Sequence, residues 1–457
     1  MKLTRSGLAL PGTQLSRLRP SPSKRPGLLP QLSSASSVAL ATVRRNRSIW
    51  QRLEVYDGMV VLGVVCYSID SLTSIHIDRK LILLLPFLAV TMALLRPNRL
   101  QELDRIRVPV GFLCYLGWAA LSLLWSDNPG TSFSAIAEYL LASIAGIALA
   151  NALTRAQMIR VFALGTKFFV VLSIATFLVA PHFATEAAAS NAPGFRGPFG
   201  NKNAFGFLMA SGLLALLFER PVTRRHKAWI AITAALLVAS EGGTSWVSLL
   251  AVLAILAWLH LWRERKQGGS RLVFASGTVL LLGGAILITA TDFPFLTHLI
   301  GKGSSLTGRT RIWDAVISAI GTRPIEGFGF GGMWLAGTGE TARIWAVLGF
   351  QAYEAHDIWL DLLLQVGIVG LVLMSVALAF ALARSFGGML RGELEPSWVA
   401  ATLLFFMIGG IAESDLFVGP LVIAALITFT LRERVPRRDL LLDRSSLGRL
   451  RTATGSL

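Results

Sequence analysis

Apolar runs separated by short polar breaks recur along most of this chain. A helix can carry such a run through about 30 Å of hydrocarbon with its backbone hydrogen bonds made within the segment. We therefore predict twelve membrane-spanning helices, at 58–74, 81–95, 108–125, 133–151, 158–180, 204–218, 228–240, 246–262, 272–291, 357–383, 397–412 and 416–431. The pattern indicates an all-α polytopic membrane protein.

Composition and charge narrow this prediction. Of the 457 residues, 53% are hydrophobic and 15% are charged, which excludes a soluble multidomain protein. With the N-terminus in the cytoplasm, 33 of the 43 lysines and arginines fall in cytoplasmic segments, as the positive-inside rule requires. The rule therefore places both termini in the cytoplasm. Anionic membrane lipids account for the net charge of +17, so we expect no nucleic-acid partner.

The chain divides into three parts. Residues 1–53 contain no acidic residue and are rich in Arg, Ser and Pro, so we predict a disordered basic cytoplasmic tail; the alternative is an organellar transit peptide. Residues 54–431 form the predicted transmembrane domain, and 432–457 form a second basic cytoplasmic tail. Two loops on the outer side, 181–203 and 292–356, are longer than ordinary connections and are therefore candidates for function.

The longer loop is predicted to contain a short amphipathic helix. Its apolar residues recur at helical spacing: Ile312, Trp313, Val316, Ile317 and Ile320. Arg309 and Arg311 then fall in the first turn, where the helix dipole disfavours cations unless an anion binds. Free N–H groups together with guanidinium groups favour a phosphate or pyrophosphate. Contacts to lipid headgroups or to Asp314 would also explain the pair.

The shorter loop carries Arg196 within a glycine-rich stretch whose composition suits turns and close approach to a ligand. Asn201 or Asn203 is expected to cap the helix that follows, on either side of Lys202. Such a cap explains the asparagines but leaves Arg196 without a role.

A single histidine stands at the outer end of the tenth predicted helix. His356 directly precedes Asp357 there. A partly desolvated imidazole at this place could act as a base near neutral pH, or serve as an amphipathic anchor at the membrane interface.

Two further patterns have structural explanations. Residues 327–332 satisfy G-x-G-x-x-G, but no strand precedes them, and we interpret them as a turn rather than a nucleotide site. Glu138 and Lys167 lie in adjacent predicted helices. A structural ion pair, or contact of Lys167 with the interface, is favoured there over an intramembrane functional pair.

Four strings occur in a characteristic order: GFRGPFGNKNAFG at 194–206, SEGGTSW at 240–246, TGRTRIWDAVISAIGTRPIEGFGFGGMW at 307–334 and AHDIWLDLLLQVGIVGL at 355–371. In order and spacing they resemble the bacterial O-antigen ligase and polysaccharide polymerase superfamily, over about residues 55–430. The string GNKNAFG at 200–206 is most similar to the exopolysaccharide polymerases of the succinoglycan type.

The resemblance implies glycosyl transfer at the periplasmic face of the bacterial inner membrane. The donor would be an oligosaccharide joined by pyrophosphate to undecaprenol. The acceptor would be a sugar hydroxyl, either of another lipid-linked repeat unit, as in a polymerase, or of the lipid A core, as in a ligase.

The site residues follow from the same resemblance. Arg196 and Arg309 match family arginines, and Arg311 is expected to join them at the pyrophosphate, with Asn201, Lys202, Asn203 and Asp357 in support. His356 matches the family histidine and would be the catalytic base of an inverting transfer. The family usually has Asn after this histidine, so the carboxylate of Asp357 is expected to raise the histidine pKa instead.

We expect the reaction to need no metal and no cofactor, because the chain has no Asp-x-Asp motif and its external acids are scattered. Membrane lipids are expected partners, and other polysaccharide assembly proteins are further candidates. The alternatives are a transporter or flippase for lipid-linked sugars, and an accessory protein that binds polymer without catalysis.

Overall fold

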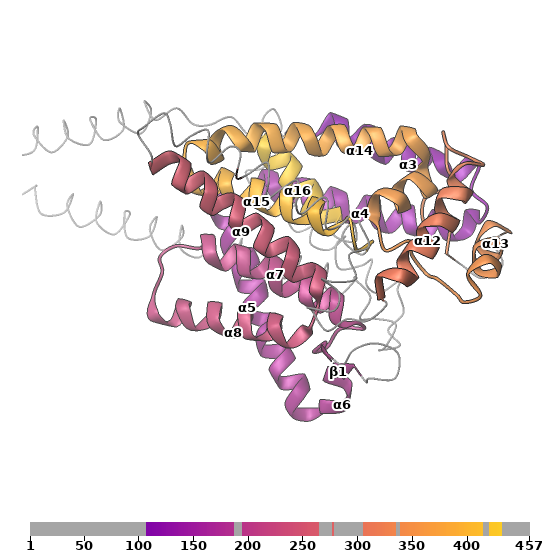
Figure 1. The fold of residues 1–457 in the computed structure, drawn as a ribbon. Coiled ribbons are helices and arrows are strands. Elements are labelled where there is room, and N and C mark those ends of the chain that lie inside the picture. The colour runs from indigo at the N-terminus through magenta and orange to yellow at the C-terminus, as the bar shows by residue number, and fades with distance from the viewer. Residues whose placement is uncertain are drawn as a thin grey trace, which may run out of the picture. The chain divides into compact units, whose positions relative to one another are not determined.

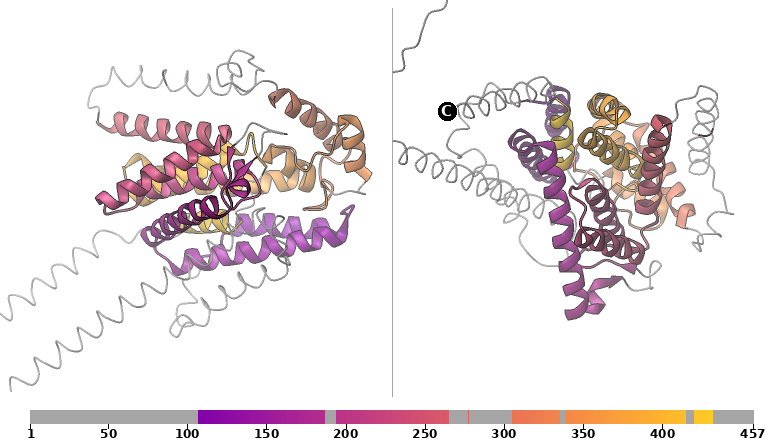
Figure 2. Two further views of the ribbon diagram at one scale, coloured as in Figure 1. Left: turned by 90° about the horizontal axis from the view of Figure 1, so that it is seen from below. Right: turned by 90° about the vertical axis from the view of Figure 1, so that its left-hand side faces the viewer.

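The computed structural model describes residues 107–186, 194–264, 277, 305–334, 339–414 and 420–431, all within one compact unit, Leu53–Leu457. The helices and strands used below are α3 (Val110–Leu121), η3 (Ser122–Leu124), α4 (Pro129–Ala152), α5 (Arg155–Val179), α6 (Pro181–Ala184), β1 (Thr185–Glu186), β2 (Gly194–Phe195), α7 (Lys202–Phe218), α8 (Arg224–Ser240), α9 (Gly243–Glu264), α12 (Ser305–Ile320), α13 (Gly339–Leu348), α14 (Ile358–Leu390), α15 (Leu394–Gly409) and α16 (Pro420–Thr430). Helices α9, α15 and α14 run side by side, and α12 with α13 lies at one end of them (Figure 1, Figure 2).

Nine of the twelve predicted spans correspond to observed helices. They are α3 with η3, α4, α5, α7, α8, α9, α14, α15 and α16, with ends within a few residues of the prediction in most cases. Helices α4, α5, α9 and α14 are long and apolar enough to cross a membrane. The predicted spans 58–74, 81–95 and 272–291 lie outside the described residues. The helical membrane fold is thus confirmed, whereas the count of twelve stays a prediction.

Polar residues at the helix starts set the boundaries of the apolar helices. Thr154 and Gln157 form a reciprocal capping box at the start of α5. Asn201 caps α7 by accepting a hydrogen bond from the Ala204 amide at 2.7 Å, as predicted. These side chains satisfy N–H groups that have no partner within the helix.

Two large apolar clusters, besides a small one that joins α9, α14 and α15, hold the described part of the fold together. The larger one joins α3, α4, α5, α7, α14, α15 and α16. The other large cluster joins the buried face of α12, including Ile312, Val316 and Ile320, to α13 and the start of α14. The predicted amphipathic helix is therefore present, and its apolar face packs against protein.

The start of α12 differs from the prediction. The helix begins at Ser305, so Arg309 and Arg311 both lie beyond its first turn. Residues 305–308 can extend the helix because they include no proline. The expected combination of free N–H groups with both arginines is therefore wrong.

Helix α14 is broken at Gly367, whose φ of 65° and ψ of −172° interrupt the helical run. A Cβ at this position would collide with the carbonyl of Ile325. Only glycine accepts this backbone conformation beside such a close neighbour without strain. The break therefore depends on the segment that follows α12.

The backbone groups freed by this break all find partners. The carbonyls of residues 364, 365 and 366 accept hydrogen bonds from the Phe328 amide, the Gly329 amide and the Trp118 indole, at 2.9, 2.9 and 2.8 Å. The amide of residue 368 donates to the Pro324 carbonyl. An interrupted apolar helix requires such satisfaction. Residues 327–332 thus form a turn docked on α14, with positive φ at three glycines, which confirms the turn interpretation.

Lys167 has a structural role at the far end of α7. Its Nζ lies 2.7 Å from Glu219 Oε2, and the Nδ1 of His226 lies 3.2 Å from the same oxygen. The ion pair ties α5 to the segment between α7 and α8.

Candidate functional site

The loop before α7 is closed by a small antiparallel pairing of β1 with β2. Just after β2, Arg196 donates from Nε to the Phe183 carbonyl and from Nη1 to the Gly200 carbonyl, both at 2.9 Å. Its guanidinium also lies over the Phe183 ring, 5.3 Å from the centroid. Arg196 therefore fastens the two sides of its own loop, a role that sequence reasoning did not supply.

A polar side chain at the start of α7 makes a contact outside this loop. Asn203 Nδ2 donates to Glu413 Oε1 at 3.1 Å. The amide of Lys202 donates to Glu186 Oε2 at 3.1 Å, and the Lys202 side chain is buried. The loop of Arg196 is thereby joined to the turn that follows α15.

Glu413 is the centre of the site. Its side chain is 2% exposed, and its Oε1 accepts hydrogen bonds from Asn203 at 3.1 Å, Thr244 at 3.3 Å and Arg309 at 3.0 Å. These donors come from α7, α9 and α12. A carboxylate buried to this degree requires such partners. Sequence reasoning missed Glu413, because a lone acid between two apolar runs has no spacing that marks it.

Both terminal nitrogens of Arg309 contact the turn that follows α15. Nη1 donates to the Ala412 carbonyl at 2.7 Å, and Nη2 contacts Glu413 Oε1. With the residues that the structure describes, these bonds use two of the five N–H donors of an arginine. The side chain is 21% exposed, so part of it is open to a ligand.

Arg311 lies elsewhere. Two residues along a helix differ by about 200° in direction, so Arg309 and Arg311 project from different sides of α12. Arg311 Nη2 donates to the Leu348 carbonyl at 3.0 Å, at the end of α13. The structure thus brings Arg309 and His356 together at Glu413, leaves Arg196 bound to its own loop, and separates Arg311 from Arg309.

His356 faces two carboxylates. Its Nδ1 lies 2.7 Å from Glu354 Oε1 and 3.9 Å from Glu413 Oε2. The backbone of His356 has a φ of 53°, a left-handed conformation that costs a non-glycine residue about 1–3 kcal/mol. The amides on both sides of it are fixed, by Asp361 and by Ser414. The surrounding structure therefore fixes the backbone from which the imidazole projects.

These carboxylates control the charge of the histidine. Burial lowers the pKa of His356, but the contacts with Glu354 and Glu413 outweigh it and raise the pKa to about 10. For Glu413, burial alone would raise the pKa. The positive charges of His356 and Arg309 outweigh burial, so the pKa of Glu413 lies below its usual range. At neutral pH the site therefore contains an imidazolium and an ionised buried carboxylate.

Asp357 does not provide the expected carboxylate. Its Oδ1 accepts hydrogen bonds from the amides of Trp359 and Leu360 at 2.9 and 3.0 Å, which caps α14. Burial raises its own pKa. The prediction that Asp357 raises the pKa of His356 is wrong in its partner, because Glu354 and Glu413 have that effect.

The same side chains could hold a metal ion. The ligand atoms of Glu354, His356 and Glu413 lie within 4.8 Å of one another. Imidazole must be neutral to bind a metal, however, and Arg309 already supplies positive charge to Glu413. The expected independence from metals stays a prediction.

The fold and this cluster define a polytopic membrane protein with an arginine and a histidine gathered at a buried glutamate. Residues 228–375, which include Arg309 and His356, match the family described as O-Antigen ligase. This part of the chain is therefore similar to that family, in agreement with the four sequence strings.

Two characterised proteins resemble a larger part of the chain. "Exopolysaccharide production protein ExoQ" of Rhizobium meliloti (strain 1021) is 23% identical over 341 residues, 70% of this chain and 76% of that protein. An "O-antigen ligase" of Pseudomonas aeruginosa (strain PAO1) is 25% identical over 332 residues, 71% of this chain and 76% of that protein. Both agree with the superfamily that the sequence resembles.

Proposed function

We propose that this chain transfers a glycosyl group from an undecaprenyl-pyrophosphate-linked oligosaccharide to a sugar hydroxyl, and so polymerises exopolysaccharide or O-antigen repeat units. The observation that carries the proposal is the meeting of Arg309 and His356 at Glu413. The match of residues 228–375 to the O-antigen ligase family and the relative named for exopolysaccharide production support it. We place the site at the periplasmic face of the inner membrane, with both termini in the cytoplasm.

The reaction would be a direct displacement at the anomeric carbon. The acceptor oxygen bonds to that carbon, the bond to the pyrophosphate oxygen breaks, and its electron pair stays on the departing pyrophosphate. The free N–H donors of Arg309 would bind this charge more tightly as it develops, which lowers the barrier. Positioned charges of the protein suffice for this step, so we propose a metal-independent, inverting transfer.

His356 was expected to be the base for the hydroxyl proton. An imidazole with a pKa near 10 already carries a proton at neutral pH, so the described arrangement favours a different role. We propose that the imidazolium adds positive charge beside Arg309, and that the Glu354 carboxylate 2.7 Å away accepts the proton. Carboxylates are the usual bases in inverting displacement at an anomeric carbon.

Three variants of the full-length chain separate these roles. If His356 acts as a cation, His356→Lys should keep measurable transfer and His356→Gln should lose it. Glu354→Gln should lose transfer as well. If both histidine variants are inactive and Glu354→Gln is active, the imidazole is the base and the revised assignment is refuted. Each rate is measured in membranes with a synthetic lipid-linked repeat unit and divided by the amount of inserted chain.

A deletion strain tests the function itself. Unpolymerised lipid-linked repeat units should accumulate on the periplasmic leaflet, and mass analysis of the surface glycans should show single units in place of polymer. Polymer of normal length that is absent only from lipid A core would indicate an O-antigen ligase, the activity that the second relative's name states. Accumulation on the cytoplasmic leaflet would instead indicate a flippase and overturn the proposal.

A further inference from the structure

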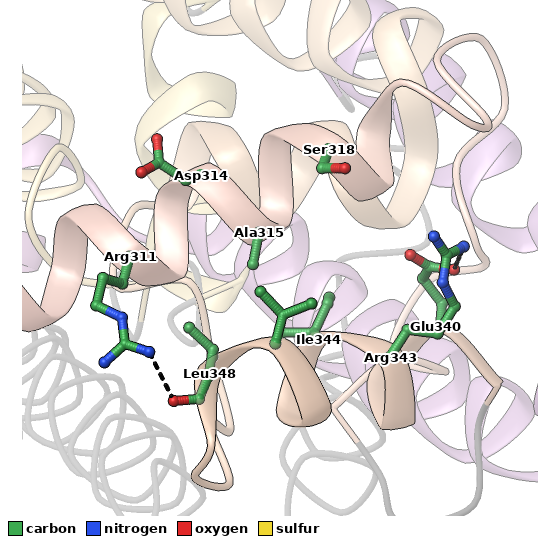
Figure 3. Close-up of a pocket in the computed structure, with 9 residues that line it drawn as sticks. Arg311, Asp314, Ala315, Ser318, Glu340, Arg343, Ile344 and Leu348 are labelled. Atoms are coloured by element: carbon green, nitrogen blue, oxygen red, sulfur yellow. Dashed lines mark hydrogen bonds and ion pairs between the residues drawn. The ribbon is translucent and has the colours of Figure 1, made fainter.

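A half-open cavity of about 310 Å³ with polar and apolar walls lies between α12 and α13, apart from the contacts around Glu413. Small-molecule sites have volumes of about 300–1,000 Å³. Arg311, Asp314 and Ser318 line it from α12, and Glu340, Arg343 and Ile344 line it from α13 (Figure 3). On α12 these residues are three and four positions apart, and on α13 Arg343 and Ile344 follow Glu340 by three and four positions, so each set forms one face.

The charges in this cavity balance. Arg343 Nη1 lies 3.0 Å from Glu340 Oε2, and Arg311 donates to the Leu348 carbonyl. Asp314 and Ser318 are exposed, and among the described residues no hydrogen bond or ion pair is made by their side chains. The buried side chains of Ala315, Ile344 and Leu348 supply an apolar floor between the two helices.

This mixture selects a class of ligand. Carboxylates only accept hydrogen bonds, guanidinium groups only donate them, and a sugar hydroxyl does both. A free anion would meet two carboxylates as well as two arginines, and a lipid chain would leave the charged groups without partners. The polar rim and apolar floor therefore suit the hydroxyls and the C–H face of an uncharged sugar.

The position of the cavity relates it to the proposed reaction. It lies on another side of the helix that carries Arg309, and a helix with its side chains is about 10–12 Å across. We propose that the cavity is a binding site for a neutral sugar residue of the glycan whose reacting end lies at Glu413. This inference rests on the proposed function, and it assigns to Arg311 a role in glycan binding rather than in pyrophosphate binding.

Binding of a glycan without lipid or phosphate tests the cavity directly. The probe is the repeat-unit oligosaccharide of the strain's own polysaccharide, titrated by calorimetry into the full-length chain in lipid nanodiscs. Loss of one hydrogen bond to a charged group weakens binding about tenfold or more, so Asp314→Asn should raise the Kd by about that factor. Ser318→Leu, which adds bulk at an exposed position, should raise it further.

Glu395→Gln is the matched control, because Glu395 is an exposed acid at the start of α15. It should leave the Kd unchanged. Wild-type Kd values for both cavity variants, or no binding by the wild-type chain, would overturn the proposal. Displacement of the oligosaccharide by inorganic phosphate would overturn the choice of ligand, because it would make the cavity an anion site.

Polymer length separates this inference from the proposed function. In a complemented deletion strain, Asp314→Asn and Ser318→Leu should yield shorter polymer, measured by size-exclusion chromatography, because the growing glycan dissociates sooner. If these variants make polymer of wild-type length, the cavity proposal fails and the transfer reaction stands. If wild-type membranes transfer no sugar while oligosaccharide binding still depends on Ser318, the proposed function fails and the cavity stands.

Discussion

Replacement of Glu413 by glutamine should reduce glycosyl transfer without preventing membrane insertion. Glutamine keeps an oxygen that can accept hydrogen bonds from Asn203, Thr244 and Arg309, but it carries no charge. Arg309 would then lose its ionised partner, and the pKa of His356 would fall from about 10 because one of its two carboxylates is gone.

The expected size of the effect follows from the contacts at Glu413. A hydrogen bond to a charged group contributes about 1.5–3 kcal/mol, and one between neutral groups about 0.5–1.5 kcal/mol. Arg309 keeps its own charge in the variant, so only the part of this contribution that comes from the carboxylate charge is lost, about 1–2 kcal/mol. If Arg309 is misplaced by that amount in the transition state, transfer slows by about 5- to 30-fold. Glu413→Ala, which breaks a buried ion pair, should cost about 3–5 kcal/mol in stability.

Glu219→Gln provides a matched control. Glu219 also pairs with a cation and a histidine, Lys167 and His226. It lies at the other end of α7, about 24 Å from Asn203 at 1.5 Å per helical residue. The initial rate of transfer from a synthetic lipid-linked repeat unit is measured in membranes for both variants. Each rate is divided by the amount of inserted chain determined by immunoblot.

The two variants should differ clearly. Glu219→Gln should give a normalised rate close to that of the wild-type chain. Equal losses in both variants would mean that glutamine at Glu413 acts only through stability. A wild-type rate for Glu413→Gln would show that the charge of this carboxylate has no part in positioning Arg309, and the reasoning above would be refuted.

Three further outcomes are expected. Arg309→Lys should slow transfer by at least tenfold, because one ammonium cannot bind the Ala412 carbonyl, Glu413 and a phosphate together. Arg311→Lys should change the initial rate much less, and equal losses in the two variants would contradict the separate placement of the two arginines. The charge of His356 is fully present below its ordinary pKa of 6.5 and is lost as pH rises through about 10. The rate of transfer should therefore be constant from about pH 7 to 9 and then fall. A rate that rises toward pH 10 would identify the imidazole as the base. EDTA should leave the rate of washed membranes unchanged, and a loss restored by a divalent cation would assign a metal to the His356 cluster.

The parts of the fold that were predictable are those with local signals. The length of the apolar runs predicted nine of the observed helices. An asparagine directly before one of these runs predicted the cap of α7. An available signal was overlooked at Asp357, since an aspartate directly before an apolar run also marks a helix cap. The start of α12 was predicted too far along the chain, because sequence patterns define helix ends less sharply than helix interiors.

The centre of the site had no such signal. Glu413 contacts Arg309 across 104 positions of sequence and Asn203 across 210. These contacts depend on the packing of α7, α9, α12 and α15, which periodicity does not encode. Family strings pointed to Arg309 and His356 one at a time, but not to the carboxylate that joins them. The separate direction of Arg311 likewise became clear only from the position of each residue around α12.

The interruption at Gly367 divides α14 into two mechanically distinct pieces. The short piece before it starts beside His356 and is clamped by the turn at residues 324–329. The longer piece after it is the one long enough to adjust its tilt when the lipid bilayer becomes thicker or thinner. The turn holds both sides of the break, because the Pro324 carbonyl also accepts a hydrogen bond from the amide of residue 368. Changes in the tilt of the longer piece should therefore reach the imidazole of His356 only weakly.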